Sequence, residues 1–157
     1  MIIEYPSAAN HFLGYHAELI LSSFKRITGK ILIDEQLSAK DRYRALFNAP
    51  FCVLSHNTEE DPVFNYGNRM ALEVFEMKWE DFTIMASKHS AEPQNREERN
   101  ALLARVTENG FIDNYKGVRV SSTGKRFFVE DAVVWNMIDE KGDYCGQGAV
   151  LYRWVKL

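Results

Sequence analysis

Histidine and cysteine are the side chains here best suited to metal binding or nucleophilic chemistry, and they are few. The chain of 157 residues contains four histidines and two cysteines. His11 and His16 are five residues apart, which on a helix turns them about 140° from each other, so they cannot share a metal ion. Cys52 and Cys145 are far apart in the sequence, a pattern that indicates free thiols in a reducing cytoplasm. We therefore expect a cytoplasmic protein without a metal centre.

Motifs of the common enzyme classes are not present in the sequence. It contains no Gly-x-Ser-x-Gly elbow, no phosphate-binding loop and no dinucleotide-binding glycine pattern. Glu130 and Asp131 are neighbours on a predicted strand, so they point to opposite faces and do not form a catalytic pair. Whichever of them faces inward would be a buried carboxylate that needs a partner. Arg119 and Arg126 are the candidates for that role.

Three polar side chains, Asn65, Tyr66 and Asn68, precede a predicted helix and could hydrogen-bond a ligand. An Asn at the start of a helix is more often a cap for the free backbone N–H groups. Both interpretations remain open at this stage.

Composition limits the possible partners. The net charge is −3, with 46% hydrophobic and 26% charged residues, which is typical of one globular domain. A nucleic-acid-binding domain usually has clustered Lys and Arg, and a membrane span needs about 18 apolar residues in a row. Neither pattern is present, so we expect no nucleic acid and no membrane as partner.

The elements that must position these side chains can be predicted from hydrophobic spacing and turn residues. We expect helices over residues 7–27, from Ser38 to Pro50, over 67–75 and from Pro93 to Asn109, with short helical turns over 79–90. The polar first half of the last helix, residues 94–100, is expected to face water. Strands are expected over residues 51–56, 63–65, 111–120, 125–138 and 147–155.

The strand over residues 125–138 is apolar on both faces. Its odd positions include Phe127, Val129, Trp135 and Met137, and its even positions are apolar as well. A strand with one solvated face should alternate apolar and polar residues, so each face must be covered. The predicted helices can cover one face. The first helix is the candidate cover for the other, and a partner subunit is the alternative.

The order of these elements, with the residues inside them, resembles the PAS fold. The resemblance is closest to the MEKHLA domain, a PAS subfamily. It rests on Pro62-Val63-Phe64-Asn65-Tyr66-Gly67-Asn68-Arg69, Trp79-Glu80-Asp81-Phe82, Ser90-Ala91-Glu92-Pro93, Gly110-Phe111-Ile112-Asp113 and Val134-Trp135-Asn136. It implies an α+β fold with a five-stranded antiparallel sheet, a helical cluster on one face and the N-terminal helix on the other. We expect an N-terminal helical segment over residues 1–49 and the PAS-like domain over residues 50–157.

The resemblance implies a non-enzymatic sensory or regulatory module that signals through a homodimer or a separate output protein. A small apolar ligand would lie between the sheet and the helical cluster, although the same side chains could simply fill the core. An isomerase or hydratase using that cavity is the alternative function. The candidate ligand-binding residues are Phe64, Asn65, Tyr66, Asn68, Met70, Phe75, Trp79, Met85, Phe111, Tyr115, Phe127, Trp135 and Met137.

The cofactor is not predicted by the resemblance. A haem-binding PAS domain needs an axial ligand in the helical cluster, and His89 is the only histidine there. A surface position is the better interpretation of His89. A photochemical flavin adduct needs a cysteine in that cluster, whereas Cys52 lies on the first predicted strand and Cys145 at the start of the last one. The sequence thus argues against both cofactors.

Overall fold

The computed structural model describes residues 2–157, and its sheet contains five strands in the order β2-β1-β5-β4-β3, with every neighbouring pair antiparallel. This arrangement confirms the expected α+β class and PAS-like sheet. In chain order the elements are η1 (Ala8–Asn10), α1 (Gly14–Thr28), α2 (Ala39–Phe47), β1 (Cys52–His56), β2 (Phe64–Gly67), α3 (Arg69–Phe75), α4 (Trp79–Phe82), η2 (Ser87–Ser90), η3 (Pro93–Asn95), α5 (Arg96–Asn109), β3 (Phe111–Val120), β4 (Arg126–Ile138) and β5 (Tyr144–Lys156).

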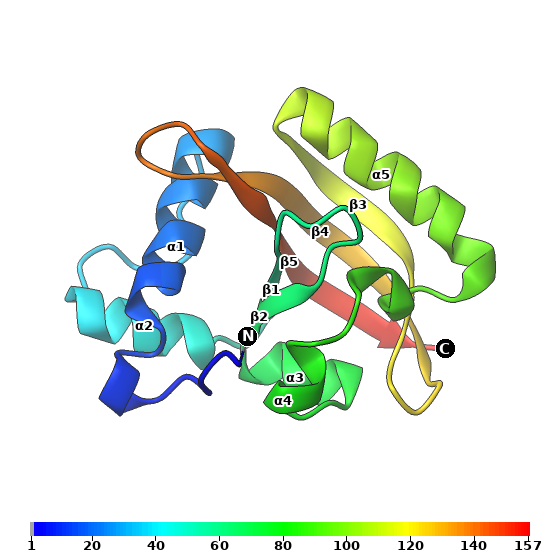
Figure 1. The fold of residues 1–157 in the computed structure, drawn as a ribbon, viewed down its shortest axis with the longest axis horizontal. Helices are drawn as coiled ribbons and strands as arrows, with labels where there is room; N and C mark the ends of the chain where they lie inside the picture. Colours follow the sequence, from blue (N-terminus) through cyan, green and yellow to red (C-terminus); the bar gives the residue numbers. More distant parts are fainter. Residues whose placement is uncertain (1) are drawn as a thin grey trace.

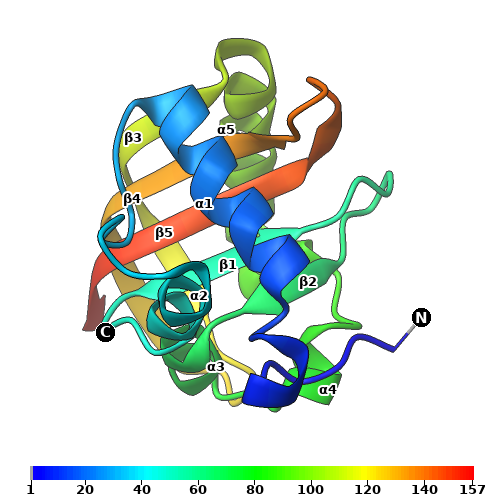
Figure 2. The ribbon, with the colours of Figure 1, turned by 90° about the vertical axis from the view of Figure 1, so that its left-hand side faces the viewer.

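Helices cover both faces of the sheet (Figure 1). Figure 2 shows α1 lying across one face, which we call the outer face, while α5 lies behind the sheet in the same view. The short helices α3 and α4 and the turn η2 complete the cover of the inner face. The strand β4 is therefore apolar on both faces because helices cover each of them, as predicted. Among residues 2–157, no helix is both long and apolar enough to cross a membrane.

The first helix begins later than its hydrophobic spacing predicts. The chain forms the single turn η1 and then places His11, Phe12 and Leu13 in the left-handed region, with φ of 54°, 54° and 55°. The Asn10 side-chain oxygen accepts hydrogen bonds from the backbone N–H groups of Ser7, at 3.0 Å, and Leu13, at 3.1 Å. Asn side chains compete with helical hydrogen bonding in this way. The predicted start at residue 7 is therefore wrong, and α1 starts at Gly14.

Contacts between α1 and β4 centre on Trp135. The indole ring packs edge-on against Phe24, with ring centroids 4.9 Å apart, and its Nε1–H donates to the Ser23 hydroxyl at 3.0 Å. Ser23, Phe24 and Trp135 are all completely buried. An aromatic pair in this geometry contributes about 0.5–1.5 kcal/mol beyond its buried area. The Ser23 contact also provides the partner that a buried indole N–H requires.

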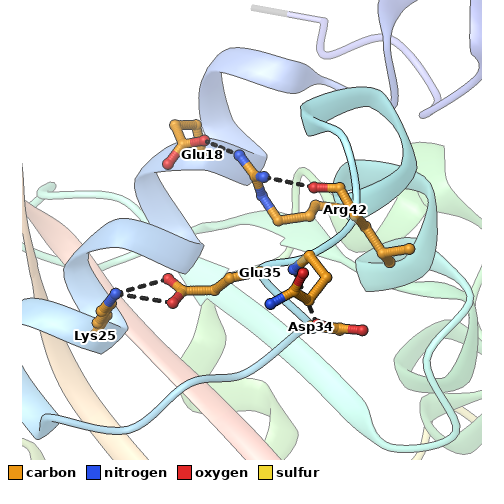
Figure 3. A network of polar contacts seen from close by, with 7 residues as sticks. Glu18, Lys25, Asp34, Glu35 and Arg42 are labelled. Atoms are coloured by element: carbon orange, nitrogen blue, oxygen red, sulfur yellow. Dashed lines mark hydrogen bonds and ion pairs between the residues drawn. The ribbon is translucent and has the colours of Figure 1, made fainter.

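Polar contacts hold the connection between α1 and α2 against α1 (Figure 3). The Lys25 ammonium lies 2.8 Å from the Glu35 carboxylate, and Arg42 lies 3.6 Å from Glu18. Arg42 also donates to the Leu37 carbonyl at 2.8 Å. These pairs are largely exposed, and such pairs contribute about 0–1 kcal/mol each. They orient the connection more than they stabilise the fold.

A bulge in each of β3 and β4 changes which side chains share a face. Asn114 and Asp131 have φ of 54° and 52°, and the register changes on both sides of Tyr115. An inserted residue moves the following side chains to the opposite face. The predicted grouping of Val129 with Trp135 is therefore wrong, because Val129 faces inward whereas Trp135 contacts α1 on the outer face.

The two neighbouring acids of β4, Glu130 and Asp131, lie at the bulge in this strand. Glu130 and Asp131 are only partly buried, and Asp131 accepts a charged hydrogen bond from Arg153 at 3.1 Å. Arg126 lies 3.8 Å from Glu92 instead. The expected buried carboxylate is therefore not present on β4: both acids stay partly exposed, although their neighbours Val129 and Ala132 are completely buried.

Candidate ligand-binding site

A cavity lies between the inner face of the sheet and the helices that cover it. It leaves about 70 Å³ open to the centre of a water molecule, and one water requires roughly 10–15 Å³ by the same measure. The wall combines apolar side chains with polar and cationic ones. The lining residues are Leu54, Ser55, His56, Phe64, Phe75, Ser87, Ser90, Arg99, Leu102, Leu103, Tyr115, Arg119, Val129, Val134, Gln147, Gly148, Ala149 and Leu151.

His56, the last residue of β1, offers an unpaired ring nitrogen to this cavity. Its side chain is only 7% exposed, and Nδ1 lies 3.0 Å from the Asn57 carbonyl. Because a carbonyl can only accept, Nδ1 carries the hydrogen, and in the neutral ring Nε2 then has a free lone pair. Nε2 is buried and has no hydrogen-bond partner within residues 2–157. Burial lowers the pKa of His56, which favours this neutral form.

Tyr115 brings a second unpaired polar atom to the cavity. It is 8% exposed, and its hydroxyl has no hydrogen-bond partner in the described part of the chain. Its position follows directly after the bulge at Asn114, and a side chain at Gly117 would overlap the hydroxyl. The Arg119 guanidinium lies over the Tyr115 ring, 5.3 Å from its centre. Buried polar atoms usually have a partner, so two without one mark a place where water or a ligand binds.

Arg99 places a buried positive charge in the wall. It is 6% exposed, and it donates hydrogen bonds to the Ser87 hydroxyl and, at 2.9 Å, to the Asn100 side-chain oxygen. Burial, and then repulsion from Arg119, lower the pKa of Arg99 to about 10, so the group is still charged at pH 7. The expectation that residues 94–100 all face water is therefore wrong at Arg99.

The sequence did contain a signal for Arg99. Arg99, Leu102 and Val106 are spaced i, i+3 and i+7 on α5, and all three are buried. Helical residues at this spacing share one face. A polar residue in line with an apolar stripe is thus a candidate for a functional interior position. Nothing comparable singled out His56, which follows Ser55 at the end of a short, mainly apolar run.

Of the predicted site residues, Phe64, Phe75 and Tyr115 line the cavity. Trp135 contacts α1 on the outer face, and Met137 shares that face by strand alternation. The Trp79 indole donates to the Ile3 carbonyl at 2.8 Å. The remaining hydrophobic candidates, whose side chains are buried or partly buried in the core and do not line the cavity, are Met70, Met85, Phe111 and Phe127.

Asn68 uses its whole side chain for structure. The amide oxygen accepts from the backbone N–H groups of Val53, at 3.0 Å, and Ala71, at 3.1 Å. The amide nitrogen donates to the carbonyls of Leu46, at 3.1 Å, and Phe51, at 2.9 Å. These four bonds join α3, β1 and the end of α2, and they leave Asn68 no free group for a ligand.

Asn65 and Tyr66 belong to a polar cluster that links β2 and β1 to α1. The Ser55 hydroxyl donates to the Asn65 side-chain oxygen at 2.5 Å and lies 2.9 Å from His16 Nε2. The His16 ring stacks on Tyr66 with centroids 5.6 Å apart. A serine beside a histidine could suggest a nucleophile, but the Ser55 hydroxyl donates to Asn65 and lies against His16 of α1, on the outer face. The cluster therefore connects β1, β2 and α1.

His89, the histidine weighed as a haem ligand, is exposed at the end of η2 and does not line the cavity.

Comparisons with known proteins agree with this architecture. The family model for the MEKHLA domain matches residues 15–156. The homeobox-leucine zipper protein HOX29 of Oryza sativa subsp. japonica is 25% identical over 123 residues, which cover 78% of this chain and 14% of the rice protein. The chain therefore spans only a small part of that relative's length.

Two solved structures show the same fold at low sequence identity. The PAS domain of a protein from Colwellia psychrerythraea superimposes with a TM-score of 0.61 at 11% identity, covering 75% of this chain and 95% of that one. The PAS domain, in complex with ethanol, of a LuxR-family transcriptional regulator from Burkholderia thailandensis gives a TM-score of 0.55 at 13% identity, covering 80% and 98%. With the strand order, the helical cover and the match over residues 15–156 in agreement, this chain belongs to the MEKHLA domain family and has the PAS fold.

Proposed function

We propose that this domain is a sensory or regulatory module that binds a small molecule in the inner-face cavity. The observation that carries the proposal is the pair of buried, unpartnered polar atoms, His56 Nε2 and the Tyr115 hydroxyl, in the wall of one cavity. The ethanol complex of the Burkholderia PAS domain shows a small molecule bound to a related fold. Because the wall is partly polar, the ligand carries polar groups, in contrast to the apolar ligand expected from the sequence.

The sheet provides a short route from the cavity to α1. Along β4, Val134 lines the cavity while the next residue, Trp135, contacts Ser23 of α1. Along β1, His56 lines the cavity while Ser55 contacts His16 of α1. A ligand that shifts either strand would therefore alter the packing of α1 on the outer face. Full switching between two packings requires roughly 5.5 kcal/mol of differential affinity.

The output of such a switch would be a second copy of the chain or a separate protein. Native mass spectrometry of freshly purified protein tests both the ligand and the homodimer, because the mass reports any bound molecule and the number of subunits. A co-purifying small molecule that is released on denaturation is the expected result. Protein that is empty and binds nothing from a metabolite library would contradict the proposal.

Hydrogen exchange of residues 14–28 tests the route to α1. We expect ligand to change the exchange rate of these amides in the unsubstituted protein. In Trp135→Phe, which removes the indole N–H that contacts Ser23, ligand should still bind while the response of α1 becomes smaller. Ligand binding without any change in α1 would refute the switch and leave the binding function in place.

One observation favours an enzyme as the second candidate function. An unprotonated His56 Nε2 and a Tyr115 hydroxyl in the same cavity are the groups that an isomerase or hydratase would use as general base and proton donor. Incubation of a bound molecule with the protein, followed by NMR, distinguishes the two functions. New resonances that depend on His56 would support catalysis, and an unchanged spectrum would support a sensor.

The division into a segment over residues 1–49 and a domain over residues 50–157 remains a proposal. Limited proteolysis tests it: a folded C-terminal fragment after cleavage between α1 and α2 or after α2 would support the division. A fragment that unfolds would show that α1 and α2 belong to the same folding unit, as their contacts with Trp135 and Asn68 suggest.

A further inference from the structure

We propose that the ligand of the cavity is a small organic carboxylate. This inference deepens the proposed function and rests on it, because it names the chemical class of the molecule that the cavity would bind. It follows from three properties of the wall: an uncompensated positive charge, unused hydrogen-bonding groups, and apolar surface around them.

The charge of the wall comes from Arg99 and Arg119. No Asp or Glu lines the cavity, and within residues 2–157 neither arginine has a carboxylate within 4.0 Å. Asp61, whose charge acts on Arg99 from farther away, forms its own ion pair with Lys88 at 3.0 Å. A buried charge is costly unless it is paired. An anion in the cavity would supply the missing charge.

The surface arginines show that pairing is available elsewhere in this protein. Arg42, Arg126 and Arg153 each lie within 4.0 Å of a carboxylate, although water already stabilises their charge. Other arginines, Arg119 among them, also lack a carboxylate within 4.0 Å, but Arg99 is the only arginine within residues 2–157 that is buried. Because water does not stabilise its charge as it does at the surface, an anion from outside the chain would be the missing partner of Arg99.

Unused hydrogen-bonding groups define the rest of the ligand. A guanidinium has five N–H donors in a planar fork that matches a carboxylate, and Arg99 uses its side chain for two hydrogen bonds within residues 2–157. His56 Nε2 can accept a hydrogen bond, and the Tyr115 hydroxyl can donate or accept one. A carboxylate that also carries a hydroxyl would satisfy the arginines and His56 together.

The apolar surface favours an organic anion over an inorganic one. Phe75, Leu102 and Val129 line the cavity beside the charged groups, and they would contact a short hydrocarbon portion. The open volume of about 70 Å³ corresponds to roughly five to seven water-sized positions. This size suits an acid with three or four carbons, such as propionate, butyrate or lactate.

Matched ligands test the proposal directly. Affinities of propionate, butyrate and lactate are measured by calorimetry at constant ionic strength, beside propionamide and lactamide, which have the same shape without the charge. Inorganic phosphate is measured as well, as an anion without an apolar portion. We expect at least tenfold tighter binding of a carboxylate than of its amide, with phosphate weaker than the carboxylates.

Matched variants assign the charge to the cavity. Arg99→Met and Arg119→Met should each weaken carboxylate binding at least tenfold. Arg105→Met, at an exposed position on the same helix, should leave the affinity unchanged. Arg119 is only partly buried, so its variant gives an answer even if Arg99→Met does not fold. Tyr115→Phe should weaken carboxylate binding while the domain stays folded.

The outcomes separate this inference from the function on which it rests. Amides that bind as tightly as carboxylates, or arginine variants that keep full affinity, would overturn the carboxylate and leave a ligand-binding module. Phosphate that binds more tightly than every carboxylate would overturn the organic part. Failure of every ligand, together with empty protein in native mass spectrometry, would refute the proposed function itself.

Discussion

Replacement of Asn68 by alanine tests whether this side chain is a simple helix cap or a connection among three elements. Asn68 is completely buried, and its amide makes four hydrogen bonds, to Val53, Ala71, Leu46 and Phe51. Asn68→Ala removes all four and leaves two N–H groups and two carbonyls without these partners.

The expected loss of stability can be worked from these contacts. An intramolecular hydrogen bond contributes about 1 kcal/mol net, so the four together give roughly 4 kcal/mol. Loss of a helix cap alone costs about 1 kcal/mol. Since a domain of this size is stable by about 5–15 kcal/mol, Asn68→Ala should remove a quarter or more of the total.

Urea unfolding followed by circular dichroism measures the difference. Ser38→Ala is the matched control, because Ser38 caps the exposed start of α2 with one hydrogen bond, at 3.3 Å. We expect the control to lose about 1 kcal/mol or less. Asn68→Asp should be less destabilising at pH 4 than at pH 7, because a protonated carboxyl can still donate to one of the two carbonyls.

A loss below about 1.5 kcal/mol for Asn68→Ala, at an unchanged dependence on urea, would refute this reasoning. Asn68 would then act as a cap only.

Three further predictions concern a histidine, two glycines and the two thiols. Burial lowers the pKa of His16 from 6.5 to about 4. Because this histidine binds a proton more tightly in the unfolded chain, the free energy of unfolding should fall as the pH drops from 6.5 toward 4. The urea midpoint should depend less on pH in His16→Asn over this range. A side chain at Gly146, where φ is 121°, would overlap the backbone of β1, whereas a side chain at Gly124, where φ is 83°, would meet open space. In urea unfolding, Gly146→Ala should therefore lower the free energy of unfolding by more than the roughly 1–2 kcal/mol expected for Gly124→Ala. Equal losses would contradict overlap with β1 as the cause. Burial raises the pKa of Cys52 to about 12. A thiol reagent should therefore modify Cys145 in the native protein and Cys52 only after unfolding. Equal modification rates of the two cysteines would show that β1 is more accessible than the burial of Cys52 implies.

The strands of the sheet could be predicted because apolar runs and turn residues indicate where a strand lies. Turns such as Ser122-Thr123-Gly124 separate long apolar runs, and the predicted strand over residues 111–120 coincides with β3. Apolar residues on both faces of residues 126–138 required a cover on each side. Hydrophobic pattern and turn chemistry are local properties, which is why the strands and the layers could be inferred. Some boundaries differ: β2 extends to Gly67, which was predicted to begin the helix, and β5 begins at Tyr144 instead of residue 147.

The cavity wall depended on features that the pattern does not encode. The bulges at Asn114 and Asp131 arise from single left-handed residues, a conformation that Asn and Asp tolerate but do not require. One such residue reverses every later side chain on the strand, so Trp135 moved away from its expected place. Arg99 lies in a polar run, and only its helical spacing to Leu102 and Val106 indicated a buried position. Phe64, Phe75 and Tyr115 line the cavity, and their role as ligand contacts stays a prediction.

The position of α1 has a consequence for any second protein that would use the outer face of the sheet. The surface of β4 around Trp135 is occupied by Phe24 and Ser23, so a competitor must first displace a helix of the same chain. The free energy of that displacement would be subtracted from the competitor's affinity. Weaker packing of α1 on β4 would lower this free energy and raise the competitor's affinity accordingly. The stability of the α1 contacts would therefore determine how readily a second protein binds the outer face.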